Sequence, residues 1–243
     1  MYNRIFAFGC SYTHFLWPTW ANIIEDDLNI SAQNWGLSGI GNVGIFHKIL
    51  ECDLKNKFTD KDLILVNWSS WSREDRVNSL GDWQAGGNVF NNHFYDKRFI
   101  KQHWTETNDI VKNSTAIISA NKMFNINYQS HMIDYEGDTE YGETRYNFSN
   151  YKFYLDSMPK KNIFDTSCNT RFNNLINDLH PDVLCHLDHV KTIYKDLNLT
   201  LKTSTAEKYT RLQNDIIEKI NSSNIDPNKN WDNLFNFFKG LNL

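Results

Sequence analysis

The chain has 243 residues, of which 40% are hydrophobic and 22% are charged, and its formal net charge is −4. These values are typical of a globular protein with a sizeable core. The sequence has no basic cluster, which argues against nucleic acid as a partner, because phosphate contacts need clustered Lys and Arg. It also has no run of about 18 apolar residues, so we expect no membrane span.

The first residues and the cysteines indicate the compartment. Only a four-residue apolar run precedes Gly9, which is too short for the core of a signal peptide. No C-x-x-C pair occurs, which disfavours a zinc knuckle, and a chain of this size needs no disulfide staples. We therefore expect a cytoplasmic protein, or one associated with a virus or other particle. Four free thiols are expected: Cys10, Cys52, Cys168 and Cys185.

Strand and helix patterns alternate in the first part of the chain. Residues 4–8, 31–35 and 62–68 predict strands, of which the last is the clearest. Apolar residues at three- and four-residue steps predict helices between them, one starting near Pro18 and one around Ile45–Leu50. This alternation is typical of a parallel sheet with crossover helices. We predict a three-layer α/β/α fold with a mostly parallel central sheet, similar to flavodoxin.

Two polar, aromatic stretches interrupt this rhythm. Residues 78–106 and 134–170 are interpreted as insertions that cover one end of the sheet. The remaining elements are a strand within 125–133, helices over 107–124 and 181–197, and a C-terminal helical extension over 203–243. The sequence has no internal repeat and no obvious linker, so we expect one domain over residues 1–243.

Ser11 lies two residues after Gly9, just past the first predicted strand. Ligands of open α/β sheets bind beyond the carboxyl ends of the strands. A serine hydroxyl at that place can point into the crevice, and backbone amides of the turn can face an oxyanion. The position of Ser11 alone is more commonly explained by a serine that only caps the following segment.

A glycine-rich loop, N-W-G-L-S-G-I-G-N at residues 34–42, follows the second predicted strand. It therefore lies at the same end of the sheet as Ser11. Its glycines let backbone amides approach a ligand, and Asn42 can donate a hydrogen bond to a substrate. The alternative is an ordinary strand-to-helix loop with Asn42 as the N-cap. A phosphate-binding loop is disfavoured, because neither G-K-[ST] nor G-x-G-x-x-G occurs.

The third candidate is the run D-L-H-P at residues 178–181. The proline makes the backbone beside His180 stiff. His180 can act as the general base for Ser11, and Asp178 can orient the ring.

Two further histidines follow on the presumed helix. Asp182, His186 and His189 have a spacing that suits a metal, but no H-E-x-x-H occurs and structural roles are favoured. We expect neither a metal nor an organic cofactor.

The runs F-G-C-S-Y-T, N-W-G-L-S-G and D-L-H-P occur in this order over about residues 4–195, and together they resemble the conserved blocks of the SGNH (GDSL) hydrolase family. The resemblance implies the SGNH fold and a serine esterase, with Ser11 as nucleophile, Gly39 in the oxyanion hole and His180 as base. It implies no cofactor. The implied substrate is a small-molecule or glycan ester with a small acyl group, often an acetyl group on a sugar.

The chain departs from the family in its first and third blocks. The first block usually reads G-D-S and here reads G-C-S, so Cys10 is a neighbour of the nucleophile. The third block, usually G-x-N-D, is replaced by V-N-W-S-S-W-S-R-E-D. Asn67 is the nearest Asn there, with Trp68 or Ser69 as alternatives at the key place.

Two assignments near the site remain open. In the third-block region, Arg73 either lines the site or forms an ordinary salt bridge with its acidic neighbours. The family's acid usually lies three residues before the histidine, where this chain has Asn177. Asp178 is therefore the candidate acid, and a Ser-His dyad assisted by a backbone carbonyl is the alternative.

The leading hypothesis is an ester hydrolase acting on a small acyl ester, with O-acetylated carbohydrate as one candidate. Four loop tryptophans either stack on sugar rings or pack internally: Trp68, Trp71, Trp83 and Trp104. The weakened third block supports a different class, a catalytically weak or inactive SGNH-fold protein that binds glycans or has a structural role. An O-acyltransferase that uses the same serine is a third hypothesis.

Overall fold

The structure is a computed structural model. It describes residues 2–91, 95–132, 153, 156–158, 173–176, 178, 180–223 and 231–240. The insertion expected over 134–170 lies almost wholly outside these residues, and so do Asn177 and Cys168.

The centre of the fold is a four-stranded parallel sheet in the order β2-β1-β3-β6. Its strands are β1 (Arg4–Phe8), β2 (Ala32–Asn34), β3 (Asp62–Trp68) and β6 (Tyr128–His131). β1 pairs with both β2 and β3, and Phe8 lies opposite Val66. The order of these strands is that of flavodoxin-like sheets.

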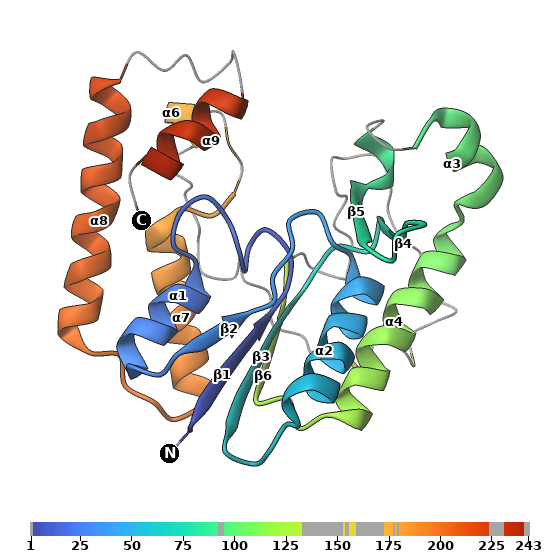
Figure 1. The fold of residues 1–243 in the computed structure, drawn as a ribbon, viewed down its shortest axis with the longest axis horizontal. Coiled ribbons are helices and arrows are strands. Elements are labelled where there is room, and N and C mark those ends of the chain that lie inside the picture. Colours follow the sequence, from blue (N-terminus) through green and yellow to red (C-terminus); the bar gives the residue numbers. More distant parts are fainter. Residues whose placement is uncertain are drawn as a thin grey trace.

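Helices cover both faces of the sheet (Figure 1). One layer contains α1 (Trp20–Leu28), α7 (Val183–Asp196) and α8 (Thr203–Ser222), and the other contains α2 (Asn42–Asn56) and α4 (Glu106–Met123). Two short helices, α6 (Asn173–Ile176) and α9 (Trp231–Gly240), lie beyond the carboxyl ends of the strands. The predicted three-layer α/β/α class is confirmed.

The core explains the high aromatic content. All seven residues of β3 are buried, because helices cover both faces of a parallel sheet. Four of the largest fully buried side chains are tryptophans, at positions 17, 20, 68 and 71. Most of these rings therefore serve burial, and Trp68 and Trp71 have no surface on which a sugar could stack.

The predicted helix starts at the two prolines are each displaced by two residues. α1 begins at Trp20, after Pro18, and α7 begins at Val183, after Pro181. Asp182 is the N-cap of α7 and accepts a hydrogen bond from the backbone of Cys185 at 2.9 Å. The capping side chain defines the start of the helix, and the proline precedes it.

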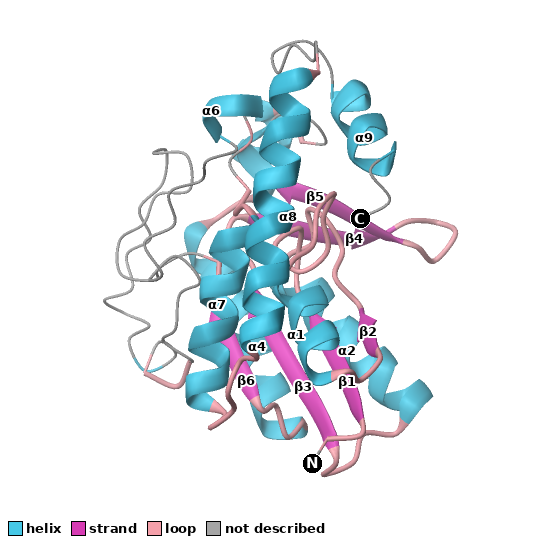
Figure 2. Ribbon diagram, turned by 90° about the vertical axis from the view of Figure 1, so that its left-hand side faces the viewer, coloured by secondary structure: helices cyan, strands magenta, loops and turns pink. Residues whose placement is uncertain are grey.

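Most of the stretch at 78–106, which was expected to be an irregular insertion, forms regular strands and helices. An antiparallel hairpin joins β4 (Arg73–Val77) to β5 (Trp83–Asn88), and η1 (Val89–Asn91) and α3 (Lys97–His103) follow. Sequence patterns miss β5, because its run W-Q-A-G-G-N contains little of the β-branched character typical of strands. Figure 2 shows the hairpin beyond the carboxyl ends of the central strands.

The hairpin holds the glycine-rich loop in place. Asp75 on β4 accepts hydrogen bonds from the backbone of Gly41 at 2.7 Å and Gly44 at 2.9 Å. The N-cap of α2 is Gly41, and not Asn42, which the alternative interpretation of the loop had placed there. Because glycine has no capping side chain, the carboxylate of Asp75 supplies the cap from another element. The Gly87 amide also donates to the Gly39 carbonyl at 3.0 Å.

Two further expectations are tested by the described residues. Cys10 and Cys52 are free and buried, but Cys185 is disulfide-bonded, so the expectation of four free thiols is wrong for Cys185. Among the described helices, none is long and apolar enough to cross a membrane.

We predict that Asp75→Ala destabilises the protein by about 1–2 kcal/mol, because two amides at the start of α2 lose their acceptor. Urea unfolding followed by far-UV circular dichroism measures this loss. Asp60→Ala removes an exposed carboxylate elsewhere and serves as the control, with an expected change within about 0.5 kcal/mol. Equal unfolding free energies for the two variants would contradict the capping role.

Candidate active site

Ser11 sits in a tight turn at the end of β1. The carbonyl of Cys10 accepts hydrogen bonds from the backbone of Thr13 at 2.9 Å and His14 at 3.2 Å. A Cβ at Gly9 would lie 2.1 Å from Thr13 Oγ1 and 2.8 Å from the Asn67 carbonyl oxygen. Only glycine fits there, and it allows the turn to approach the end of β3 closely.

Ser11, His180 and Asp178 are hydrogen-bonded in series. Ser11 Oγ lies 2.9 Å from His180 Nε2, although the two residues are 169 positions apart in the chain. Asp178 Oδ1 lies 2.8 Å from His180 Nδ1. The serine and the aspartate are buried, while the histidine side chain is 25% exposed. These three side chains thus have the geometry of a catalytic triad.

Asp178 reaches the ring although it stands only two residues before the histidine. Its Oδ1 also accepts the backbone N–H of His180 at 2.7 Å. A carboxylate bonded to the N–H two residues on is an Asx-turn, which brings the side chain back over the following residues. This turn lets Asp178 contact Nδ1 from the shortened spacing.

Aromatic rings hold the imidazole of His180 in place. Phe15 stacks on it with ring centroids 3.8 Å apart and an interplanar angle of 21°. Tyr12 meets it edge-on at 5.6 Å. Trp17 packs on Phe15 and donates from Nε1 to the Pro181 carbonyl at 2.8 Å. The loop after Ser11 therefore positions the histidine from its face and through its backbone.

The glycine-rich loop lies against the Ser11 turn. Leu37 N–H donates to the Gly9 carbonyl at 3.0 Å, and Asn34 Nδ2 donates to the Thr13 carbonyl at 2.8 Å. Gly39 has a φ of 80°, a left-handed conformation that favours glycine. Within the described part of the chain, the backbone N–H groups of Ser11 and Gly39 have no hydrogen-bond acceptor. A donor to an oxyanion must be unoccupied in this way.

Asn67 and Trp68 are placed differently from the expectation that they contact an oxyanion or substrate. Asn67 is fully buried, and its Nδ2 donates to Ser130 Oγ at 2.9 Å on the neighbouring strand β6. Trp68 is equally buried and donates from Nε1 to Gln129 Oε1 at 2.9 Å. Both side chains join β3 to β6, and neither reaches the site surface.

Asn42 and Arg73 were also expected to contact the substrate. In the structure, their side chains instead bond to backbone groups at the end of β3 and in the glycine-rich loop. Asn42 is buried and bonds the backbone of Ser69 through both side-chain atoms, at 2.7 and 3.1 Å. Arg73 is 8% exposed and donates to the Ile40 carbonyl at 3.1 Å. These contacts fix the ends of β3 and of the glycine-rich loop relative to each other.

The histidines on α7 do not form a metal site with described residues, because no group of three metal-ligating side chains occurs among them. Burial lowers the pKa of His189 to about 3. Burial, together with the neighbouring His189 and His180, holds the pKa of His186 well below its usual range. Both rings are neutral near pH 7, and Ser130 Oγ lies 3.3 Å from His189 Nε2.

Two residues that support the candidate site, Phe15 and Asp75, could not be predicted from the sequence. Phe15 lies four residues after Ser11 but has no pattern that marks it as a partner of a distant histidine. Asp75 caps a helix from a different element, and capping of this kind leaves no local pattern in the sequence.

The chain resembles several solved structures. A lipolytic G-D-S-L family protein from Veillonella parvula is 15% identical, with a TM-score of 0.42, and the match covers 79% of this chain and 96% of that one. The psychrotrophic esterase EstA from Pseudoalteromonas sp. is 12% identical, with a TM-score of 0.43 and coverage of 86% and 99%. An acetylxylan esterase from Geobacillus stearothermophilus is 12% identical, with a TM-score of 0.42 and coverage of 83% and 97%. By sequence, the chain matches no family model and no curated protein.

These similarities are too distant to assign an activity by themselves. The functional proposal therefore depends on the geometry of the residues in this chain.

We predict that the free energy of unfolding decreases as the pH falls below about 6.5. His186 and His189 are neutral when folded but take up protons at that pH once unfolded, so stability is complete above the unfolded pKa and is lost towards the folded one. Each histidine contributes a slope of about 1.4 kcal/mol per pH unit in this range. Urea unfolding between pH 7 and 5 measures it.

Burial also holds the pKa of His131 well below its usual range, so three histidines contribute to the slope. His189→Gln removes one of them and should reduce the slope by about one third. His47→Gln changes an exposed histidine and should leave the slope unchanged. A slope that His189→Gln leaves as in the parent chain would contradict this assignment.

Proposed function

We propose that this protein is a serine ester hydrolase in which Ser11 is the nucleophile, His180 the general base and Asp178 the residue that orients the base. The observation that carries the proposal is the series of contacts from Ser11 Oγ to His180 Nε2 at 2.9 Å and from His180 Nδ1 to Asp178 Oδ1 at 2.8 Å. A serine hydroxyl becomes a useful nucleophile only when an adjacent base removes its proton.

The reaction follows from these positions. Ser11 Oγ bonds to the ester carbonyl carbon, its proton passes to His180 Nε2, and the π electrons of the carbonyl move onto its oxygen. The N–H groups of Ser11 and Gly39 stabilise that oxyanion. The tetrahedral intermediate then collapses, the bond to the alcohol oxygen breaks, and His180 donates its proton to that oxygen. Water, activated by the same histidine, releases the acid and restores Ser11.

For the substrate, we propose an ester with a small acyl group, and O-acetylated carbohydrate is the alternative that the resemblance of the sequence suggests. The sugar-stacking role is weakened for the buried Trp68 and Trp71. Trp104 donates to Asp109 Oδ2 at 2.7 Å and packs on Phe90, while Trp83 packs on His47. Burial thus accounts for Trp68 and Trp71, and the half-buried Trp83 and Trp104 each have a ring partner in the protein, which favours the ester over the sugar as the recognised group.

One observation favours the alternative of weak or absent turnover. Asn67, the candidate third oxyanion donor, is occupied by Ser130. The two remaining backbone donors make hydrolysis the better supported proposal, and an acyl transfer to an alcohol would use the same intermediate.

We predict that a fluorophosphonate probe labels the protein and that Ser11→Ala abolishes labelling, because the probe reacts with an activated serine. Gel fluorescence and intact mass measure the adduct. Ser204→Ala, which removes an exposed hydroxyl on α8, outside the candidate site, is the control and should be labelled as the parent is. A folded parent chain that takes no label would refute the catalytic proposal.

We predict that His180→Ala lowers kcat for p-nitrophenyl acetate by about 10⁴-fold or more, because the serine loses its base. Asp178→Asn should lower kcat by about 10²–10⁴-fold with little change in KM, because the amide no longer selects the correct tautomer of the imidazole. Steady-state kinetics measures both effects. A large loss in His186→Gln combined with a mild one in His180→Ala would identify a different base.

The transferase alternative is tested with the same ester and an added alcohol acceptor. Hydrolysis predicts free acid as the product by mass spectrometry, whereas a transferase would give the new ester in its place.

A further inference from the structure

Beside the candidate active site lies an apolar pocket of about 390 Å³. Three segments that are distant in sequence line it: His14–Leu16 in the loop after Ser11, Leu37–Ser38 in the glycine-rich loop, and Phe235 on α9. Its volume is in the range of small-molecule sites. Four of its six lining residues are Phe or Leu, and they offer a hydrocarbon surface with few hydrogen-bonding groups.

The pocket shares residues with the catalytic geometry. Phe15 forms one wall and stacks on His180 at 3.8 Å. Ser38 forms another and directly precedes Gly39, whose N–H is the proposed oxyanion donor. The pocket therefore borders both the residue that stacks on His180 and the loop that carries Gly39.

Helix α9 lies beside this pocket and contributes Phe235 to its wall. Phe238 on α9 is buried and packs on Trp17 with ring centroids 5.1 Å apart. Phe235 lies three residues earlier and hence on the same side of the helix, and it is 51% exposed. A large exposed aromatic ring at the wall of a pocket is available to cover a bound apolar group.

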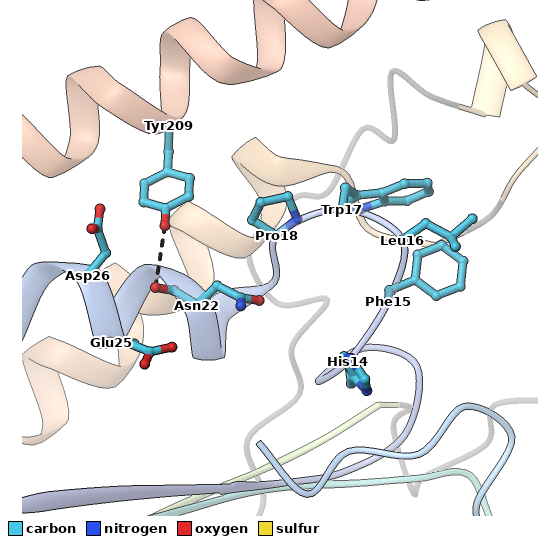
Figure 3. Close-up of a pocket in the computed structure, with 9 residues that line it drawn as sticks. All are labelled: His14, Phe15, Leu16, Trp17, Pro18, Asn22, Glu25, Asp26 and Tyr209. Atoms are coloured by element: carbon cyan, nitrogen blue, oxygen red, sulfur yellow. Dashed lines mark hydrogen bonds between the residues drawn. The ribbon is translucent and has the colours of Figure 1, made fainter. Parts of the chain in front are cut away.

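A second hollow, on the other side of the same loop, has the opposite chemistry. Glu25, Asp26, Asn22 and Tyr209 line it, together with residues of the loop from His14 to Pro18. Figure 3 shows Phe15 and Leu16 pointing away from these polar side chains. The hollow on the α1 side is polar, so a hydrocarbon group partitions to the pocket that Phe235 lines.

We propose that this pocket binds the acyl chain of the substrate, and that the enzyme prefers esters with an apolar acyl chain of about four to six carbons over acetate esters. The inference rests on the proposed esterase function and specifies its substrate. The leaving alcohol must meet the Nε2 edge of His180 to receive its proton. Phe15 covers the face of that ring, and Ser38, next to Gly39, places the pocket on the side of the glycine-rich loop, where the acyl carbonyl would meet its oxyanion donor, so the pocket suits the acyl side.

The test compares kcat/KM for p-nitrophenyl acetate, butyrate and hexanoate. Each of the four extra methylenes, when buried, is worth about fourfold, so the ratio of hexanoate to acetate should reach about two hundred. This ratio does not depend on the fraction of active enzyme, so it remains interpretable in a variant that folds poorly. All turnover must disappear in Ser11→Ala.

Two variants locate the effect. Phe235→Ala removes a wall and should lower the hexanoate-to-acetate ratio about tenfold, and Leu16→Trp fills the pocket and should bring the ratio near one. Leu54→Ala is the matched control, because it truncates a 60% exposed side chain on α2, outside the pocket, and should leave the ratio unchanged.

The outcomes separate the two proposals. Ser11-dependent turnover with a flat acyl series, or a ratio that neither pocket variant changes, overturns the acyl pocket and leaves the esterase standing. A rise along ethyl, butyl and hexyl acetate in place of the acyl series overturns the acyl assignment, because the pocket then holds the alcohol. Absence of Ser11-dependent turnover of every ester overturns the esterase proposal and the pocket with it.

Discussion

The close approach at Gly9 is the constraint on which the candidate site depends. A Cβ there would collide with Thr13 and press on the Asn67 carbonyl oxygen, so the turn that carries Ser11 lies directly on the end of β3. The Gly9 carbonyl also receives the Leu37 amide, which brings the glycine-rich loop onto the same turn. The lack of one methyl group thus allows the ends of β1, β2 and β3 to meet around the serine.

The support around this point comes from residues outside the series Ser11, His180 and Asp178. Asp75 caps α2 from the hairpin, Asn42 bonds the end of β3, and Phe15 stacks on His180. Each of these contacts restrains one of the three loops that contribute to the site. Preorganised donors and a fixed imidazole lower the cost of reaching the transition state, so such restraint is part of how the proposed reaction would proceed.

The sequence predicted the features that have a local signature. The apolar run of β3 and the alternation of strands with helices predict the sheet and its layers, and short blocks identify Ser11, Gly39 and His180. Asp178 was also identified, although its contact depends on an Asx-turn that spacing alone does not reveal. The roles of Asn67 and Trp68 could not be predicted, because they depend on pairing between β3 and β6, which are distant in sequence. The hairpin was missed for a similar reason, since tertiary contacts and not strand propensity hold it.

The distance of 169 residues between Ser11 and His180 has a consequence during synthesis. At about 5–20 residues per second, roughly 8–34 seconds pass between the emergence of the serine and that of the histidine from the ribosome. His180 has not been made during that interval, so Ser11, the proposed nucleophile, has no base beside it. A nascent chain of this protein therefore cannot form the pair of Ser11 and His180 until residues beyond 180 are being translated.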